Sequence, residues 1–165
     1  YAPLMYQLAE SGIDCFLVDM PFHMAFFGMN RAEEIMQEYN YEAWYLGGHS
    51  LGGAMAANFA ADYVEDHTDG IRGLLLLAAY PTKDLSTSDM SVVTVYGSED
   101  GVLNMDKIVA GRELMPQDYK EVCIEGGNHA QFGSYGTQKG DGTAAIPAEE
   151  QWARTVEVFV GDESE

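Results

Sequence analysis

Short apolar runs alternate along the chain with segments that carry their apolar residues at helical spacing. The run Leu74–Ala79 is apolar on both faces, which is typical of a central strand in a parallel sheet. Four further short runs, apolar or rich in β-branched residues, are Cys15–Val18, Ala43–Leu46, Val92–Tyr96 and Tyr119–Ile124. Because these five predicted strands alternate with helices, we expect an α/β protein, with a mostly parallel sheet covered by helices on both faces in three layers.

The helical segments between these runs have recognisable ends. Leu4 and Leu8 predict a helix that ends before Gly12, a typical stop residue. Asn30 and Glu33 predict a capping box that opens a second helix, which ends near Tyr39. Further helices are expected over residues 51–64, over residues 104–114, and from Pro147 onward with an apolar face of Trp152, Val156 and Phe159.

Two segments interrupt the alternation. Residues 80–90 form a polar loop, and residues 133–146 form a loop with four glycines that is too long to serve only as a connector. Within it, Gly140-Asp141-Gly142 lacks the ligand spacing of a calcium loop and is interpreted as a turn. The sequence has no internal repeat and no evident boundary, so residues 1–165 are expected to belong to a single domain.

The chain is strongly acidic. Its 165 residues include 27 Asp and Glu against 8 Lys and Arg, for a formal net charge of −19. This charge repels phosphate backbones and anionic lipids, so we expect no nucleic-acid partner and no membrane contact from this segment. Cys15 and Cys123 have no metal-binding spacing and are predicted to be buried free thiols, which favours a cytoplasmic location.

The strongest chemical signal is the sequence Gly48-His49-Ser50-Leu51-Gly52. It follows a predicted strand and opens a helix rich in small residues, which is the context of a nucleophile elbow. Ser50 is then the predicted nucleophile, and the backbone N–H of Leu51 is the predicted oxyanion donor at the helix start. Gly48 and Gly52 are expected to keep side chains out of the place where the strand and helix backbones pass.

A serine nucleophile needs a base, and the chain has four histidines. His129 is the preferred base, because it follows the fifth predicted strand at the sheet edge where active sites of α/β proteins form. His23 follows the first predicted strand and is its rival. His49 is expected to pack beside the elbow and to point away from Ser50, and His67 to be solvated in an acidic stretch.

The histidine in turn needs a carboxylate that orients it. Glu99 and Asp100 end the fourth predicted strand, and spacing alone does not separate them. Asp84, after the third predicted strand, is a weaker third candidate. The chain order Ser50, Asp100, His129 matches the order serine, acid, histidine of the nucleophile-elbow enzymes.

These motifs resemble those of the α/β-hydrolase superfamily, and within it the small bacterial hydrolases that are similar to dienelactone hydrolases. The resemblance rests on GHSLGG at Gly48–Gly53, YGSEDG at Tyr96–Gly101 and GNHAQFG at Gly127–Gly133. In such proteins the acid is the last residue of a Gly-x-x-Asp turn, which selects Asp100. The segment from Tyr135 to Gly142 also resembles a loop that follows the histidine in other members.

Two departures from that pattern change the expectation. Dienelactone hydrolases proper use a cysteine nucleophile, whereas Ser50 stands here, which favours a general ester over a lactone. The family fold also places a strand and a glycine-rich loop, the source of a second oxyanion N–H, before the helix that here begins at Tyr1. We therefore expect a C-terminal portion of the fold, inactive and poorly soluble alone. An N-terminal anchor that holds the protein outside the cytoplasm is the alternative location.

Together these observations predict a serine hydrolase of small or medium carboxylic esters that works through an acyl-enzyme and needs no cofactor or metal. The expected partner is the small-molecule ester, and the oligomeric state is left open. An acyltransferase with the same triad, and a catalytically silent binding module on the same fold, are the alternatives. The candidate substrate-binding side chains are Phe22, His23, His49 and Tyr135.

Overall fold

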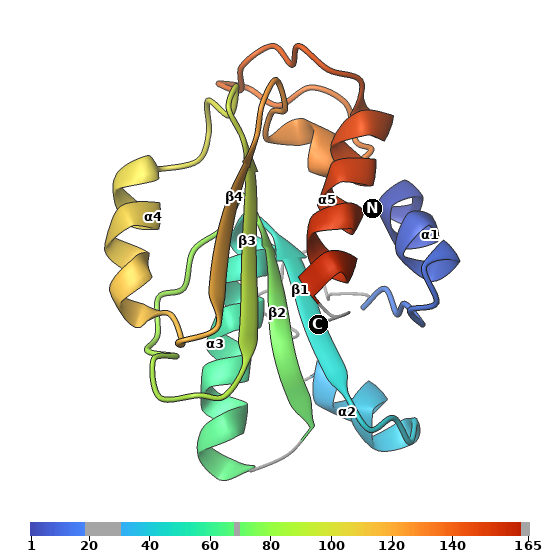
Figure 1. The fold of residues 1–165 in the computed structure, drawn as a ribbon, viewed down its shortest axis with the longest axis vertical. Helices are drawn as coiled ribbons and strands as arrows, with labels where there is room; N and C mark the ends of the chain where they lie inside the picture. The colour runs from blue at the N-terminus through green and yellow to red at the C-terminus, as the bar shows by residue number, and fades with distance from the viewer. Residues whose placement is uncertain (19–30, 68–69, 163–165) are drawn as a thin grey trace. The chain divides into compact units, whose positions relative to one another are not determined.

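The computed structural model describes residues 1–18, 31–67 and 70–162 (Figure 1). Four strands, β1 (Trp44–His49), β2 (Ile71–Leu77), β3 (Ser91–Gly97) and β4 (Tyr119–Ile124), form one parallel sheet in the order β1-β2-β3-β4. The α-helices are α1 (Ala2–Glu10), α2 (Arg31–Glu38), α3 (Leu51–Asp66), α4 (Met105–Gly111) and α5 (Ala148–Asp162). The described residues also include the short 3-10 helices η3 (Arg112–Leu114) and η4 (Ala130–Phe132). The predicted α/β class with a parallel sheet is confirmed.

One predicted strand does not form. The run Cys15–Val18 has no regular secondary structure, and the side chain of Leu17 is 66% exposed. An apolar run indicates burial, but a strand also needs a ladder of backbone hydrogen bonds to a neighbour. The prediction of a buried strand from these four residues is therefore wrong.

The other element predictions need smaller corrections. The strand expected over Leu74–Ala79 begins earlier and ends at Leu77, because Ala78 has a φ of 47° that a strand does not accommodate. The helix expected over residues 104–114 is α4 followed by η3. Gly12 has a φ of 89° directly after α1, as the prediction of a glycine stop requires. The predicted N-cap Asn30 lies outside the described residues.

By their internal contacts the residues fall into two compact units. Unit 1 comprises Tyr1–Phe16, Val95–Leu103 and Glu121–Glu165, and unit 2 comprises Leu17–Thr94 and Asn104–Lys120. In unit 2, α3 packs along β1 and β2 (Figure 1). Ala57 and Ala60 are completely buried in the same hydrophobic cluster as Leu74 and Leu76 of β2. Small side chains on α3 therefore meet large ones on the sheet, which lets the helix lie close to the strands.

Unit 1 is built around α5, which packs against α1 and η4. Its predicted apolar face is confirmed, because Trp152, Val156 and Phe159 are all buried. The indole N–H of Trp152 also donates to the carbonyl of Gln131 at 2.5 Å, so α5 fixes the backbone of η4. This unit contains the loop that carries His129.

The thiols differ from expectation. Cys123 is exposed and Cys15 is half-buried, and both are free. The prediction of two buried thiols is therefore wrong: Cys123 lies at an exposed position of β4, next to the buried Ile124. None of the helices within the described residues is both long enough and apolar enough to cross a membrane.

Candidate active site

Ser50 lies at the turn between β1 and α3, in unit 2. Its backbone has φ 55° and ψ −124°, a left-handed conformation that residues with a side chain rarely adopt. The Ser50 N–H donates to the carbonyl of Leu77 at 2.8 Å, and its own carbonyl accepts from Gly53 and Ala54 at 3.0 and 3.2 Å. The sharp turn is thus held by β2 on one side and by the first turn of α3 on the other. Backbone strain of this kind costs about 1–3 kcal/mol and concentrates at functional sites.

Two glycines make this turn sterically feasible. A Cβ at Gly48 would lie 2.5 Å from backbone atoms of Gly52 and Gly53, and a Cβ at Gly53 would lie 2.5 Å from the Cβ of Ala79. A Cβ at Gly52 would meet no atom within 4 Å. The expectation for Gly48 holds, but the second required glycine is Gly53 and not Gly52.

The residues on either side of Ser50 have different exposures. Leu51 begins α3, and its side chain is 60% exposed. The first N–H groups of an α-helix have no partner within the helix and carry partial positive charge, so the Leu51 N–H is suited to a developing oxyanion. His49 ends β1 and is buried.

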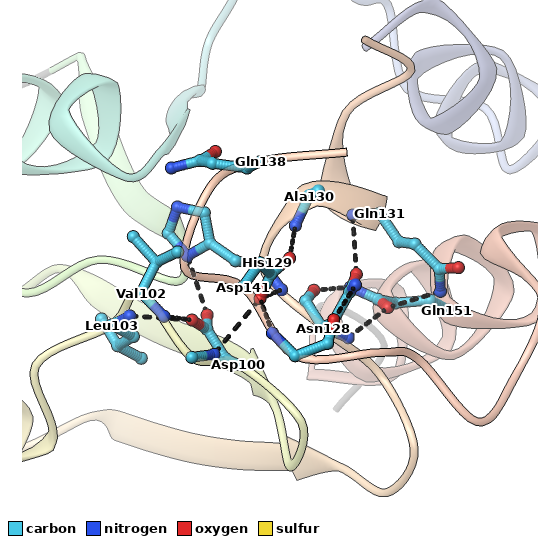
Figure 2. A network of polar contacts seen from close by, with 12 residues as sticks. Asp100, Val102, Leu103, Asn128, His129, Ala130, Gln131, Gln138, Asp141 and Gln151 are labelled. Carbon is cyan, nitrogen blue, oxygen red and sulfur yellow. Dashed lines mark hydrogen bonds and ion pairs between the residues drawn. The ribbon is translucent and has the colours of Figure 1, made fainter. Parts of the chain in front are cut away.

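In unit 1, Asp100 and His129 form a buried pair (Figure 2). The Nδ1 atom of His129 lies 2.8 Å from Oδ2 of Asp100, and their side chains are 1% and 2% exposed. The other oxygen of Asp100 accepts the backbone N–H groups of Val102 and Leu103 at 2.9 and 2.8 Å. Both oxygens of the carboxylate are therefore used, and the carboxylate has one fixed orientation toward the imidazole.

These contacts explain the acidity of Asp100. Burial by itself raises the pKa of this carboxyl, because it disfavours the charged form. The hydrogen bonds from His129, Leu103 and Val102 outweigh burial and hold the pKa below its usual value. Asp100 is accordingly a carboxylate at neutral pH, which is the form that orients a histidine and stabilises its imidazolium.

The other candidate carboxylates are placed differently. Glu99 is exposed, and its carboxylate accepts from the hydroxyl of Ser98 at 3.2 Å. Asp84 is exposed in unit 2, where its carboxylate accepts the backbone N–H of Ser86 at 2.9 Å. Of the three candidates, Asp100 is the one that the structure pairs with His129.

The remaining predicted site residues belong to different parts of the chain. Phe22 and His23 lie outside the described residues. His67 is exposed and stacks on Tyr63, with ring centroids 4.1 Å apart. Tyr135 is 49% exposed in unit 1, and its hydroxyl donates to Oε1 of Gln138 at 2.9 Å. Burial, followed by the charges of Tyr1, Asp141 and Asp100, raises the pKa of Tyr135 to about 12.

Asp141 is the residue that sequence reasoning missed. Its Oδ1 accepts backbone N–H groups from Gly101 at 3.2 Å, from His129 at 3.2 Å and from Gly142 at 2.9 Å. Its Oδ2 accepts the N–H of Ala130 at 2.8 Å (Figure 2). The signal in the sequence was an aspartate between two glycines in an unusually long loop, but nothing in its spacing shows which backbone it meets.

A network of amide side chains holds the same loop from the side of α5. Asn128 and Gln151 exchange two hydrogen bonds: the Asn128 N–H donates to Oε1 of Gln151 at 3.0 Å, and Nε2 of Gln151 donates to the Asn128 carbonyl at 2.8 Å. The side chain of Asn128 donates to Gly142 and accepts from the N–H of Gln131. Gln151 is completely buried, so these bonds form in a medium where unmet polar groups are costly. The backbone next to His129 is therefore rigidly fixed.

Each unit carries a different part of the expected chemistry. Unit 2 presents a hydroxyl on a strained turn at a helix N-terminus, and unit 1 presents an oriented acid–base pair. A hydroxyl nucleophile, a base and an orienting acid are the parts of covalent acyl transfer. The described His, Cys, Asp and Glu side chains include no group of three or more that could hold a metal ion.

Comparisons with known proteins agree with the fold. The sequence matches the family model described as "Alpha/beta hydrolase family" over residues 1–153. The search of curated proteins found no match.

Several solved structures resemble the chain. A monoacylglycerol lipase of Paleococcus ferrophilus has a TM-score of 0.71 and 16% identity, and the match covers 98% of this chain and 89% of that one. The esterase domain of a Rhodothermus marinus protein has a TM-score of 0.58 and 12% identity, with 82% and 66% covered. A dienelactone hydrolase-like promiscuous phosphotriesterase from metagenomic libraries has a TM-score of 0.54 and 15% identity, with 82% and 62% covered. These likenesses confirm the expected fold.

Proposed function

The chain belongs to the alpha/beta hydrolase family, and we propose that it is a serine hydrolase that cleaves small or medium carboxylic esters. The observation that carries the proposal is the buried pair of Asp100 and His129, whose Oδ2 and Nδ1 atoms lie 2.8 Å apart. This bond favours the tautomer of His129 with its proton on Nδ1, so Nε2 is the basic nitrogen. Ser50, on its strained turn, is the hydroxyl that this base serves in the proposed triad.

The first half of the proposed reaction forms an acyl-enzyme. As Ser50 Oγ attacks the ester carbonyl carbon, its proton passes to Nε2 of His129, and the carbonyl π electrons move onto oxygen. The Leu51 N–H donates to that oxyanion, while Asp100 stabilises the imidazolium. The intermediate then collapses, the C–O bond to the alcohol breaks, and His129 returns its proton to the leaving alkoxide.

The second half releases the acid. Water attacks the acyl carbon, His129 takes its proton, and the bond to Ser50 Oγ breaks with return of that proton to the serine. The carboxylic acid leaves, and each residue regains its starting protonation state. An alcohol in place of water would give a new ester by the same steps, which is the acyltransferase alternative.

Fluorophosphonate labelling with peptide mass spectrometry tests the nucleophile. In the full-length protein we expect one adduct, on Ser50, and loss of ester hydrolysis in Ser50→Ala. Ser88→Ala is the matched control, because the Ser88 hydroxyl donates to the Leu85 carbonyl in the loop of residues 80–90. Unchanged hydrolysis in Ser50→Ala would overturn the proposal, and a folded protein that resists every serine-directed probe would favour the binding module.

The similar solved structures suggest which substrates to include in an activity assay. One neighbour is described as a monoacylglycerol lipase and another as a promiscuous phosphotriesterase, so the panel pairs p-nitrophenyl esters of increasing acyl length with a monoacylglycerol and a phosphotriester. We expect the carboxylic esters to be turned over best, because the proposed triad acts on an acyl carbonyl. Adding acceptor alcohols and measuring new ester against free acid separates hydrolysis from acyl transfer.

A further inference from the structure

We propose that Asp141 is a positioning residue of this active site, whose carboxylate fixes the backbone of His129 relative to the turn that carries Asp100. The inference rests on the proposed function, because it assigns Asp141 to the base of that reaction. The Asp141 carboxylate accepts hydrogen bonds from the backbone of the histidine loop.

A single oxygen joins the two loops of the acid–base pair. Oδ1 of Asp141 accepts from the N–H of His129 and from the N–H of Gly101, the residue that follows Asp100. The His129–Asp100 hydrogen bond and this bridge therefore connect the same two segments at two points (Figure 2). The backbone N–H of Glu99 also donates to the carbonyl of Gly127 at 2.8 Å, and the Asp141 bridge adds a further connection directly beside the acid–base pair.

Glycines bring the Asp141 segment into backbone contact with the acid turn. A Cβ at Gly142 would lie 2.0 Å from the carbonyl oxygen of Glu99, and a Cβ at Gly101 would lie 2.4 Å from the carbonyl oxygen of Gly140. Either distance is far shorter than real carbon–oxygen contacts, so both positions need glycine. The loop is thus built to approach the acid turn closely, and Asp141 is the residue whose side chain uses that approach.

The groups around the carboxylate identify its role. Asp141 accepts four backbone N–H groups, from Gly101, His129, Ala130 and Gly142. A bound cation would have to occupy the space where these hydrogens point, so the geometry favours an internal acceptor over a metal ligand. Hydrogen bonds to an ionised acceptor are about twice as strong as neutral ones, which explains an aspartate here better than an asparagine.

We call these hydrogen bonds from backbone N–H groups to the Asp141 carboxylate the clamp. The clamp matters because proton transfer depends on the position of the imidazole. Asp141 holds the His129 N–H and the Ala130 N–H with different oxygens, which fixes the backbone that carries the ring. A displacement of about 1 Å in a catalytic group can cost about 10²-fold in rate. Loss of the clamp is therefore expected to slow the chemical step without changing how the ester binds.

Two substitutions of Asp141 test the clamp. We expect both Asp141→Ala and Asp141→Asn to lower kcat by about 10- to 100-fold with KM unchanged, because outer partners of catalytic groups typically contribute this much. In the asparagine variant, an NH2 group replaces one carboxylate oxygen. This group is a donor, so it cannot accept the backbone N–H groups that the oxygen accepted. Asp84→Asn is the matched control, because its exposed carboxylate accepts a backbone N–H in a loop of unit 2. A normal kcat in both Asp141 variants, or an equal loss in Asp84→Asn, would overturn the proposal.

A second variant moves the clamp without altering its chemistry. Gly142→Ala pushes the Asp141 segment away from Glu99, and we expect the same fall in kcat with KM unchanged. Gly161→Ala in α5 is its control, because a Cβ there meets no atom within 4 Å. An active Gly142→Ala enzyme would contradict the role of the close approach.

A spectroscopic measurement separates this inference from the proposed function. We expect the Nδ1 proton of His129, hydrogen-bonded to Asp100, to give a far-downfield signal in proton NMR, which requires no turnover. We expect the signal to persist in Ser50→Ala and Asp84→Asn and to shift or broaden in Asp141→Asn and Gly142→Ala. If ester hydrolysis proves independent of Ser50 while the signal still changes in the Asp141 variant, the proposed function fails and the positioning of His129 stands. An unchanged signal in folded Asp141→Asn overturns the positioning.

Discussion

Gly48 and Gly53 approach each other so closely that neither position has room for a side chain. A Cβ on Gly48 would lie 2.5 Å from the nitrogen of Gly53, and a Cβ on Gly53 would lie 2.6 Å from the carbonyl oxygen of Gly48. Ser50 sits between them in a left-handed conformation. The contact therefore closes the turn that presents the serine hydroxyl.

This contact predicts that the three glycines of the turn respond differently to alanine. Gly48→Ala and Gly53→Ala should each destabilise the fold by about 1–3 kcal/mol or more, the range for overpacking, and should abolish labelling of Ser50. Gly52→Ala should be neutral or stabilising by about 0.5–1 kcal/mol, because alanine is the better helix former and its Cβ meets nothing within 4 Å. Urea denaturation and fluorophosphonate labelling of the three variants measure both effects. Equal losses at Gly52 and Gly53 would contradict this steric account.

The orienting role of Asp100 predicts a large and specific loss of rate. Asp100→Asn removes the charge and can donate to Nδ1, which favours the wrong imidazole tautomer, so we expect kcat to fall by about 10⁴-fold. Glu99→Gln is the control, because Glu99 is exposed and contacts Ser98 instead of His129. Initial rates with a p-nitrophenyl ester compare the two variants. A similar fall in Glu99→Gln would mean that the acid has been assigned to the wrong neighbour.

Much of the fold follows from the sequence because local pattern and burial agree. β4 occupies Tyr119–Ile124 as predicted, and α5 buries the predicted apolar face. The run Cys15–Val18 failed because an apolar composition does not specify a strand partner. Likewise, part of the requirement at Gly53 arises from Ala79, a residue that follows a different strand. Such contacts depend on the tertiary arrangement, which sequence spacing does not record.

The candidate site likewise contains residues that the sequence predicts and one that it does not. Ser50 and His129 each follow a strand end within a short motif, and the family resemblance selects Asp100 over its neighbour Glu99. Asp141 has no such context, since it is recognised only by the backbone N–H groups that the fold brings to it. When the partners of a side chain are backbone N–H groups, the residue types do not reveal them, because almost every residue has a backbone N–H.

The raised pKa values of the two thiols predict resistance to alkylation. Burial, then the nearby carboxylates Glu125 and Glu121, raises the pKa of Cys123, and burial followed by Asp14 raises that of Cys15. Both residues are therefore mostly protonated at neutral pH, and the thiolate is the reactive form. We expect iodoacetamide at pH 7 to leave ester hydrolysis unchanged while a fluorophosphonate abolishes it. Inhibition that tracks alkylation of either cysteine would argue against a serine nucleophile.

The lowered pKa of Asp100 predicts a specific loss of stability in acid. A carboxyl whose pKa is lower in the folded state contributes stability above its unfolded pKa of about 3.9, and this contribution disappears as pH falls through the folded pKa. We therefore expect the difference in unfolding free energy between the wild type and Asp100→Asn to shrink as the pH falls from about 5 to below about 4. Protonation of the other carboxylates is common to both proteins and cancels in this difference.

Urea denaturation between pH 7 and pH 3 measures that difference, with Asp84→Asn as the comparison. Hydrogen bonds from Ser86 lower the pKa of Asp84 as well, but this carboxylate is fully exposed, and solvent screens its interactions. The curve for Asp84→Asn should therefore stay close to that of the wild type at every pH. A difference for Asp100→Asn that does not change with pH would show that the buried pair contributes through packing alone, and that its charge is not what the folded state stabilises.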